Sequence, residues 1–184
     1  MSLLSGLTVR PRLPQDLPTL YRWLYAEPNP EWQRWDGPYF SKQRSKLSFE
    51  AYAERADVNP WNEDQQIVAL GSECIGFLSR FEEAPSGGGW YELGVVIFDP
   101  QHWSSGLGTR ALSLWTAATF AEKPAHLITL STWSGNARMI RAAERVGYRE
   151  CARIPEARNW DGQRWDSVKL GMLRREFESA HLAP

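Results

Sequence analysis

The segment from Val95 to Ala111 constrains the fold more than any other part of the sequence. An apolar strand pattern over residues 90–98 stops at Asp99-Pro100, because proline lacks the N–H that a central strand must donate. A short polar loop follows, and then Gly106 and Gly108 open an amphipathic helix. A strand that leads into a helix in this way indicates an α/β arrangement.

The loop from Ser104 to Gly108 has the composition of an anion-binding helix start. The first turn of a helix has backbone N–H groups without partners inside the helix, and it has a partial positive charge. Glycine at positions 106 and 108 lets the backbone approach an anion closely. The loop therefore predicts an anion site, most naturally for a pyrophosphate.

Two other nucleotide-binding motifs fit Gly106 and Gly108 less well, and an ordinary helix start stays open. A Walker A loop needs a lysine after its last glycine, and Thr109 stands there instead. A dinucleotide fingerprint matches Gly106 to Ala111 on paper, but the strand ends near Phe98, and the next strand ends in Ser131-Thr132-Trp133 without an acidic residue. On this segment alone, an ordinary glycine-rich helix start remains an alternative.

The rest of the chain alternates strands and helices without a linker. The patterns predict helices over 17–24, 48–56, 107–122 and 136–146, and strands over 7–12, 66–70, 74–81, 90–98, 126–132, 148–158 and 164–173. The Pro- and Trp-rich stretch 27–40 is expected to be irregular or to hold only a short helical turn. This order predicts an α/β (α+β) fold, with helices on both faces of one mixed sheet, and a single domain over residues 1–184.

Composition excludes several classes of protein. The formal net charge is -1, which argues against nucleic acid as the main partner. Two cysteines and three scattered histidines make neither a disulfide framework nor a metal cluster, so we expect no metal. There is no apolar run long enough for a membrane span and no signal-peptide pattern at the start, so we expect a cytoplasmic protein without a membrane partner. A homodimer is a candidate assembly.

Two motifs resemble those of one family. The run Trp103-Ser104-Ser105-Gly106-Leu107-Gly108 resembles the cofactor loop [Q/R]xxGx[G/A] of the GNAT superfamily of N-acetyltransferases, with the tryptophan found in its RimJ/RimL branch. Ser104 and Ser105 replace the Gly-Lys pair of that branch, so one phosphate-facing cation is missing, and Arg110 is a candidate substitute. The run from Thr132 through Asn136 to Arg145-Val146-Gly147-Tyr148 is similar to the motif that follows in the same branch.

The resemblance implies a GNAT-type fold, with a mostly antiparallel sheet of about seven strands and a splay between the fourth and fifth strands. It implies acetyl-CoA as cofactor, with the pantetheine arm in that splay. On this sequence the backbone N–H of Val96 would polarise the thioester carbonyl, and Phe98 would pair with the pantetheine. The cofactor-binding residues that the resemblance implies are Val96, Ile97, Phe98, Trp103, Ser104, Ser105, Gly106, Leu107, Gly108, Thr109, Asn136 and Arg141.

The resemblance also implies acetyl transfer to an amine. Glu92 is the candidate general base, because strand alternation puts it on the same face as Val96. The positions where family members have a Tyr or Ser proton donor are Ala143 and Met139 here. Either the thiolate leaves unassisted, or Tyr148 or Tyr91 serves. The missing donors leave a non-catalytic acyl-CoA-binding sensor module as the alternative function.

The acceptor site is expected in the aromatic stretches. The chain has ten tryptophans, several of them in polar, turn-rich segments. Rings next to carboxylates could hold a cationic amine, of a protein N-terminus or a small molecule. The candidates are Trp32, Trp35, Tyr39, Trp160 and Trp165. The competing interpretation is that these rings fill the core or a dimer seam.

Overall fold

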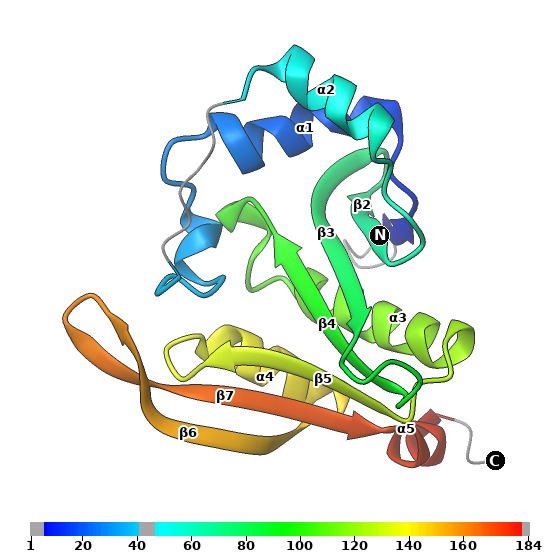
Figure 1. Cartoon of the computed structure of the whole chain (residues 1–184), viewed down its shortest axis with the longest axis vertical. Helices are drawn as coiled ribbons and strands as arrows, with labels where there is room; N and C mark the ends of the chain where they lie inside the picture. Colours follow the sequence, from blue (N-terminus) through cyan, green and yellow to red (C-terminus); the bar gives the residue numbers. More distant parts are fainter. Residues whose placement is uncertain (1–5, 41–46, 182–184) are drawn as a thin grey trace.

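Seven strands form one sheet in the computed structural model, which describes residues 6–40 and 47–181. The sheet order is β1-β2-β3-β4-β5-β7-β6, and only β4 and β5 are parallel neighbours (Figure 1). The strands are β1 (Leu7–Arg10), β2 (Gln65–Leu70), β3 (Glu73–Glu82), β4 (Trp90–Ile97), β5 (Leu127–Trp133), β6 (Arg149–Trp160) and β7 (Gln163–Leu173). The predicted mixed, mostly antiparallel sheet is therefore confirmed.

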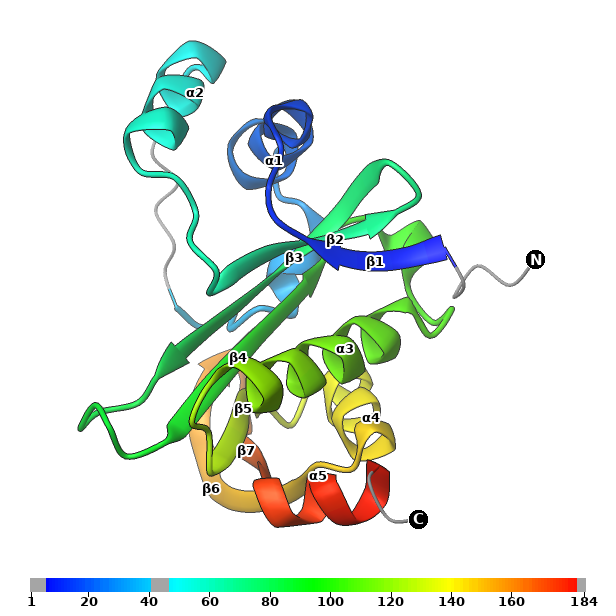
Figure 2. The same ribbon diagram turned by 90° about the vertical axis from the view of Figure 1, so that its right-hand side faces the viewer.

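Helices cover both faces of the sheet, as predicted. Figure 2 shows α1 (Leu17–Tyr21) and α2 (Phe49–Val58) on one side, and α3 (Leu107–Glu122) and α4 (Ala137–Val146) on the other. The prediction missed α5 (Arg174–His181), because its sequence is mostly polar. Its Phe177 ring packs 4.9 Å from the ring of Phe120 in α3, so a tertiary contact stabilises this short helix.

Local sequence fixes the helix ends near the site. The Ser48 hydroxyl accepts a hydrogen bond from the N–H of Ala51 at 3.2 Å and caps α2. The Asn136 side chain caps α4 in the same way, through the N–H of Met139 at 3.2 Å. Gly147 ends α4 with a left-handed φ of 109°, which glycine adopts without strain.

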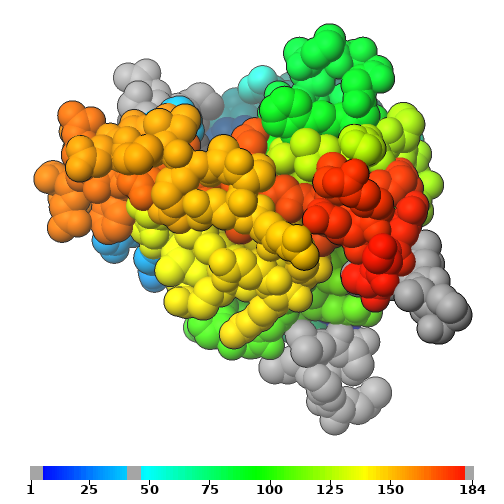
Figure 3. Space-filling model, turned by 90° about the horizontal axis from the view of Figure 1, so that it is seen from below, coloured from blue at the N-terminus to red at the C-terminus, as the bar shows by residue number. Residues whose placement is uncertain are grey.

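Two hydrophobic cores lie on opposite faces of the sheet. The core under α3 and α4 includes Trp115 and Leu130, and the core under α1 and α2 includes Trp32 and Phe98. Seen from below, β6, α4 and α5 form the surface (Figure 3), and most of β6 is exposed. No helix in the described part of the chain is long and apolar enough to span a membrane.

Gly76 allows β3 to lie unusually close to β4. A Cβ at this position would lie 2.1 Å from the carbonyl oxygen of Val96. A backbone oxygen cannot move away as a flexible side chain does, so only glycine fits here. This close approach sets the position of the part of β4 that lines the site.

Candidate active site

Strands β4 and β5 pair over only three residues and then separate. The pairs are Trp90 with Leu127, Tyr91 with Ile128, and Glu92 with Thr129. Beyond them, β4 continues to Ile97 and β5 to Trp133. Figure 1 shows the two strands diverging toward the segment that precedes α2. The predicted splay between the fourth and fifth strands is therefore present.

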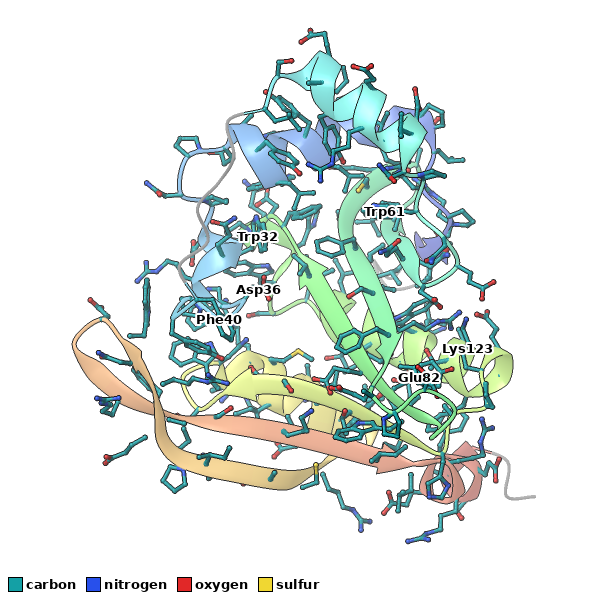
Figure 4. All side chains as sticks on the ribbon, in the orientation of Figure 1. Trp32, Asp36, Phe40, Trp61, Glu82 and Lys123 are labelled. Carbon is teal, nitrogen blue, oxygen red and sulfur yellow. The ribbon has the colours of Figure 1, made fainter. Side chains whose placement is uncertain are left out.

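A cavity of about 940 Å³ occupies this separation. Its walls come from both strands, the loop before α3, one face of α4, the stretch 32–40 and the β6–β7 hairpin. Trp32, Asp36 and Phe40 line it, and Figure 4 shows these residues between the tip of β4 and the hairpin. Of the predicted cofactor residues, Val96, Ile97, Trp103, Ser104, Gly106, Gly108, Thr109, Asn136 and Arg141 line the cavity, whereas Phe98, Ser105 and Leu107 do not.

The loop before α3 presents free backbone N–H groups at the edge of this cavity. Ser104 and Gly106 have left-handed φ values of 60° and 87°. Within residues 6–40 and 47–181, the N–H groups from Ser104 to Thr109 donate no hydrogen bond, and the first such donor in the helix is Arg110, to Gly106 at 2.9 Å. A cluster of unpartnered N–H groups at a helix start fits an anion.

Trp103 fixes this loop against the end of β4. Its indole N–H donates to the carbonyl of Ile97 at 2.9 Å. The Ser105 hydroxyl donates to the carbonyl of His102 at 2.6 Å, which closes the turn. Neither bond uses the backbone N–H groups from Ser104 to Thr109. The loop is therefore held in place while these groups remain available to an anion.

Arginines on one face of α4 supply positive charge to the cavity. Arg138, Arg141 and Arg145 all line it. None of them forms an ion pair with a carboxylate in the described residues. Of these three arginines, only Arg141 was predicted as a cofactor-binding residue. The spacing of three and then four residues between them indicates one helix face, so the other two could have been found in the sequence. Arg110, the substitute considered for the missing lysine of the loop, is exposed and does not line the cavity.

The β3–β4 ladder decides which N–H groups of β4 face the gap. In an antiparallel pair, facing residues alternate between hydrogen-bonded and non-bonded pairs. Glu83 N–H donates to the carbonyl of Trp90 at 2.7 Å, and Phe98 N–H donates to the carbonyl of Ile75 at 3.0 Å. The register between these two bonds is unbroken. Every second residue from Trp90 to Phe98 therefore bonds to β3.

This alternation corrects two predicted roles. Val96 lies in the hydrogen-bonded series, so its N–H points at β3 and not at the gap. The N–H groups of Val95 and Ile97 face the gap in its place. Phe98 donates to Ile75 and is fully buried, with its ring 5.9 Å from Trp23, so it is a core residue rather than a pantetheine partner.

Glu92 lies in the last β4–β5 pair, immediately before the strands separate. Its side chain is buried and accepts hydrogen bonds from the Thr129 hydroxyl and, at 3.1 Å, from the Lys169 ammonium. Glu92 is not among the residues that line the cavity. The carboxylate therefore lies close to the narrow end of the gap, in a polar network.

The two tyrosines considered as proton donors lie outside the cavity. Tyr148 is buried in the core and shares a 2.7 Å hydrogen bond with the Thr116 hydroxyl. Burial raises the pKa of Tyr148 far above its ordinary value. Tyr91 is also a core residue. Tyr39 does line the cavity, and burial raises its pKa, an effect that the nearby Arg158 partly offsets.

The five aromatic acceptor candidates separate into two groups. Trp32, Trp35 and Tyr39 line the main cavity. Trp160 and Trp165 instead line a smaller hollow of about 210 Å³, together with Trp35. The predicted single acceptor pocket is therefore divided, and Trp35 borders both parts.

Asn136 has two structural contacts as well as its place in the cavity wall. Besides capping α4, its side-chain N–H donates to the carbonyl of Trp35 at 3.0 Å. This bond ties the aromatic stretch before α2 to the start of α4.

The positions where family members have a proton donor are Met139, which lines the cavity, and Ala143, which is buried. Neither side chain has a hydroxyl group. The described residues contain no group of metal-binding side chains.

A mixed sheet that opens between two parallel strands, with a helix start at the opening, is the arrangement expected of a GNAT-type acyltransferase. Residues 6–149 match the profile of the acetyltransferase (GNAT) domain. The chain belongs to this family and is an N-acetyltransferase.

Solved structures of low sequence identity have the same fold. An acetyltransferase of the GNAT family from Bacillus anthracis is 16% identical, with a TM-score of 0.70 over 92% of this chain and 96% of that one. Spermidine N-acetyltransferase from Vibrio cholerae, in complex with CoA and spermine, is 18% identical, with a TM-score of 0.74 over 94% and 98%. An aminoglycoside acetyltransferase in complex with coenzyme A is 19% identical, with a TM-score of 0.68 over 96% and 99%.

Proposed function

We propose that the protein transfers the acetyl group of acetyl-CoA to a primary amine by direct attack of the amine on the thioester. The observation that supports this most strongly is the cluster of unpartnered N–H groups from Ser104 to Thr109 at the edge of the β4–β5 cavity. A diphosphate held there leaves the thioester end of the cofactor directed into the gap between the strands.

Positive charge in the cavity supports the same cofactor. Coenzyme A has several phosphate charges, and Arg138, Arg141 and Arg145 line the cavity without carboxylate partners in the described residues. Unpaired arginines oppose one another electrostatically, and a phosphorylated cofactor relieves that repulsion. The CoA complexes of two similar structures are consistent with this assignment.

The free backbone of β4 supports the chemistry of transfer. The N–H groups of Val95 and Ile97 face the gap, where they can donate to the oxygen of the thioester carbonyl as negative charge develops on it. Glu92 remains the proposed base. Because its carboxylate contacts Thr129 and Lys169 and not the cavity, it would take the proton of the amine through an intervening water.

The acceptor end of the cavity supports an amine substrate. Asp36 lines this cavity together with Trp32, Trp35 and Tyr39, and a carboxylate and aromatic rings suit an ammonium group before it loses its proton. Similar structures contain spermine or belong to an aminoglycoside acetyltransferase. The tryptophan at position 103 favours the RimJ/RimL branch, and this resemblance suggests a protein N-terminus or another small primary amine as the acceptor.

Release of free thiol from acetyl-CoA, measured across a panel of peptides and small amines, tests this function. Acetylation of at least one amine, with the product identified by mass, is the expected result. CoA binding by calorimetry without turnover of any amine would contradict the enzyme and support the sensor alternative. Loss of both signals would reject the cofactor site as well.

A further inference from the structure

Arg158 projects into the acceptor end of the cavity from β6. Its guanidinium carbon lies 4.7 Å from the ring centroid of Tyr39 and 5.4 Å from that of Phe40. One of its terminal N–H groups donates to the Ser167 hydroxyl at 3.3 Å. Arg158 and Ser167 both line the cavity, so the group is held against its wall by two rings and one neutral hydroxyl.

Among the residues that the structure describes, the positive charge of Arg158 has no carboxylate partner. No ion pair involves Arg158 among residues 6–40 and 47–181, and its buried Nε–H lacks a hydrogen-bond acceptor there. A half-buried guanidinium usually pairs with a carboxylate, because an uncompensated charge destabilises the folded state. By contrast, Arg153 on the same strand is paired with both Glu150 and Asp166.

The acceptor end therefore contains groups of both signs. Asp36 and Arg158 both line the cavity. A polycation would find the carboxylate there, but it would also meet the fixed positive charge of Arg158. An amine that also has a negative group matches both.

We propose that Arg158 is a specificity-determining residue that binds a carboxylate of the acceptor, so that the preferred acceptor is an amino carboxylate rather than a polyamine. The planar fork of a guanidinium matches the two oxygens of a carboxylate. The rings of Tyr39 and Phe40 limit its rotation, so little side-chain entropy is lost on binding. This inference rests on the proposed acetyl transfer to an amine.

The test compares kcat/KM for ω-amino carboxylates of increasing length with that of their carboxamides, which differ only in charge. We expect the wild-type protein to prefer the carboxylate of the best pair by at least about tenfold, as for one charge-assisted hydrogen-bonded contact. Arg158→Gln should abolish this preference, so that the kcat/KM values of the carboxylate and of its carboxamide lie within about twofold of each other. Arg158→Lys should retain part of it, because the charge stays but the fork is lost.

Arg164→Gln is the matched control, since Arg164 is an exposed arginine of the same hairpin outside the cavity. It should keep the wild-type preference. A wild-type protein that acetylates carboxamides or spermine as well as the carboxylates would overturn the proposal for Arg158 while leaving acetyl transfer intact. Stronger selection of aminoalkyl phosphonates than of carboxylates would overturn the choice of carboxylate.

A binding measurement separates this proposal from the proposed function. N-acetylated amino carboxylates, titrated by calorimetry into protein saturated with CoA, should bind to the wild type and lose at least about tenfold in affinity in Arg158→Gln. Melting temperatures of the variants check that they fold. Equal affinity in a folded Arg158→Gln protein would reject the proposed binding of a carboxylate by Arg158. Failure of CoA itself to bind would reject the proposed function.

Discussion

Trp35 and Trp103 both pack against one guanidinium, that of Arg138. The guanidinium carbon lies 4.3 Å from the ring centroid of Trp35 and 4.2 Å from that of Trp103. Trp35 belongs to the aromatic wall of the proposed acceptor end, and Trp103 begins the loop of the proposed anion site. Arg138 therefore connects the two ends of the cavity.

This connection predicts that Arg138→Ala weakens cofactor binding and loosens the aromatic wall. Each cation–π contact contributes about 0.5–2 kcal/mol, so the CoA dissociation constant should rise by roughly tenfold. Arg138→Lys keeps the charge but not the flat stacking surface and should give a smaller rise. Calorimetric titration with CoA provides the measurement, and unchanged affinity in Arg138→Ala would remove this residue from the cofactor site.

Replacing Gly106 tests the loop directly. Gly106→Glu places a side chain at a left-handed position and a negative charge beside the anion site, so CoA binding should fall below detection. Gly87→Glu is the matched control, because Gly87 has the same φ of 87° and open space around it in an exposed turn. A Gly106→Glu protein that binds CoA like the Gly87→Glu protein would show that the phosphates lie elsewhere.

The role of Glu92 can be separated from its part in the buried network. Glu92→Gln should lower kcat by about 10²-fold or more, the usual contribution of a general base, with CoA affinity nearly unchanged. Lys169→Gln leaves the Glu92 carboxylate in place and should retain more activity. Equal losses in the two variants would mean that Glu92 only positions β4 against β5. Wild-type activity of Glu92→Gln at every pH would remove it from the mechanism altogether.

Acid should destabilise the fold partly through Asp16. Burial acts to raise the pKa of Asp16, but hydrogen bonds from Arg10 at 2.7 and 2.8 Å and from the Leu13 N–H at 2.7 Å outweigh it and lower the pKa. The carboxylate therefore stabilises the folded state above the unfolded-state pKa of about 4, and this contribution is lost as pH falls through the lower folded value.

Asp16→Asn should lower the free energy of unfolding by about 1–3 kcal/mol at neutral pH, because Arg10 and the Leu13 N–H lose their hydrogen bonds to a buried, charged carboxylate. The difference between wild type and variant should shrink as the pH drops below about 4. Urea denaturation at a series of pH values measures both effects. A difference that is the same at neutral and acid pH would contradict the ionised pair.

Local patterns predict the elements of this fold well, and side-chain geometry much less well. The strand over residues 90–98, the glycine pair and the caps at Ser48 and Asn136 depend on neighbours in the chain, so the sequence reveals them. The direction of the Val96 N–H depends on which β3 residues it faces, and that register comes from the approach of β3 at Gly76. No local pattern contains this information.

The cavity wall at the proposed acceptor end was predicted only in part for the same reason. Trp32, Trp35 and Tyr39 could be found because a single Trp-rich stretch contains them. Arg158 lies far away in the chain, in a strand where most residues are exposed, so nothing in its neighbours marks it as part of a cavity. Only the packing of the hairpin against Tyr39 and Phe40 brings it there.

A crystal structure with acetyl-CoA bound tests the central claim most directly. We predict diphosphate oxygens within hydrogen-bond distance of the N–H groups from Ser104 to Thr109, and the acetyl group in the gap beside the N–H groups of Val95 and Ile97. A cofactor bound at another surface, or those N–H groups of the loop bonded within the protein, would contradict the account.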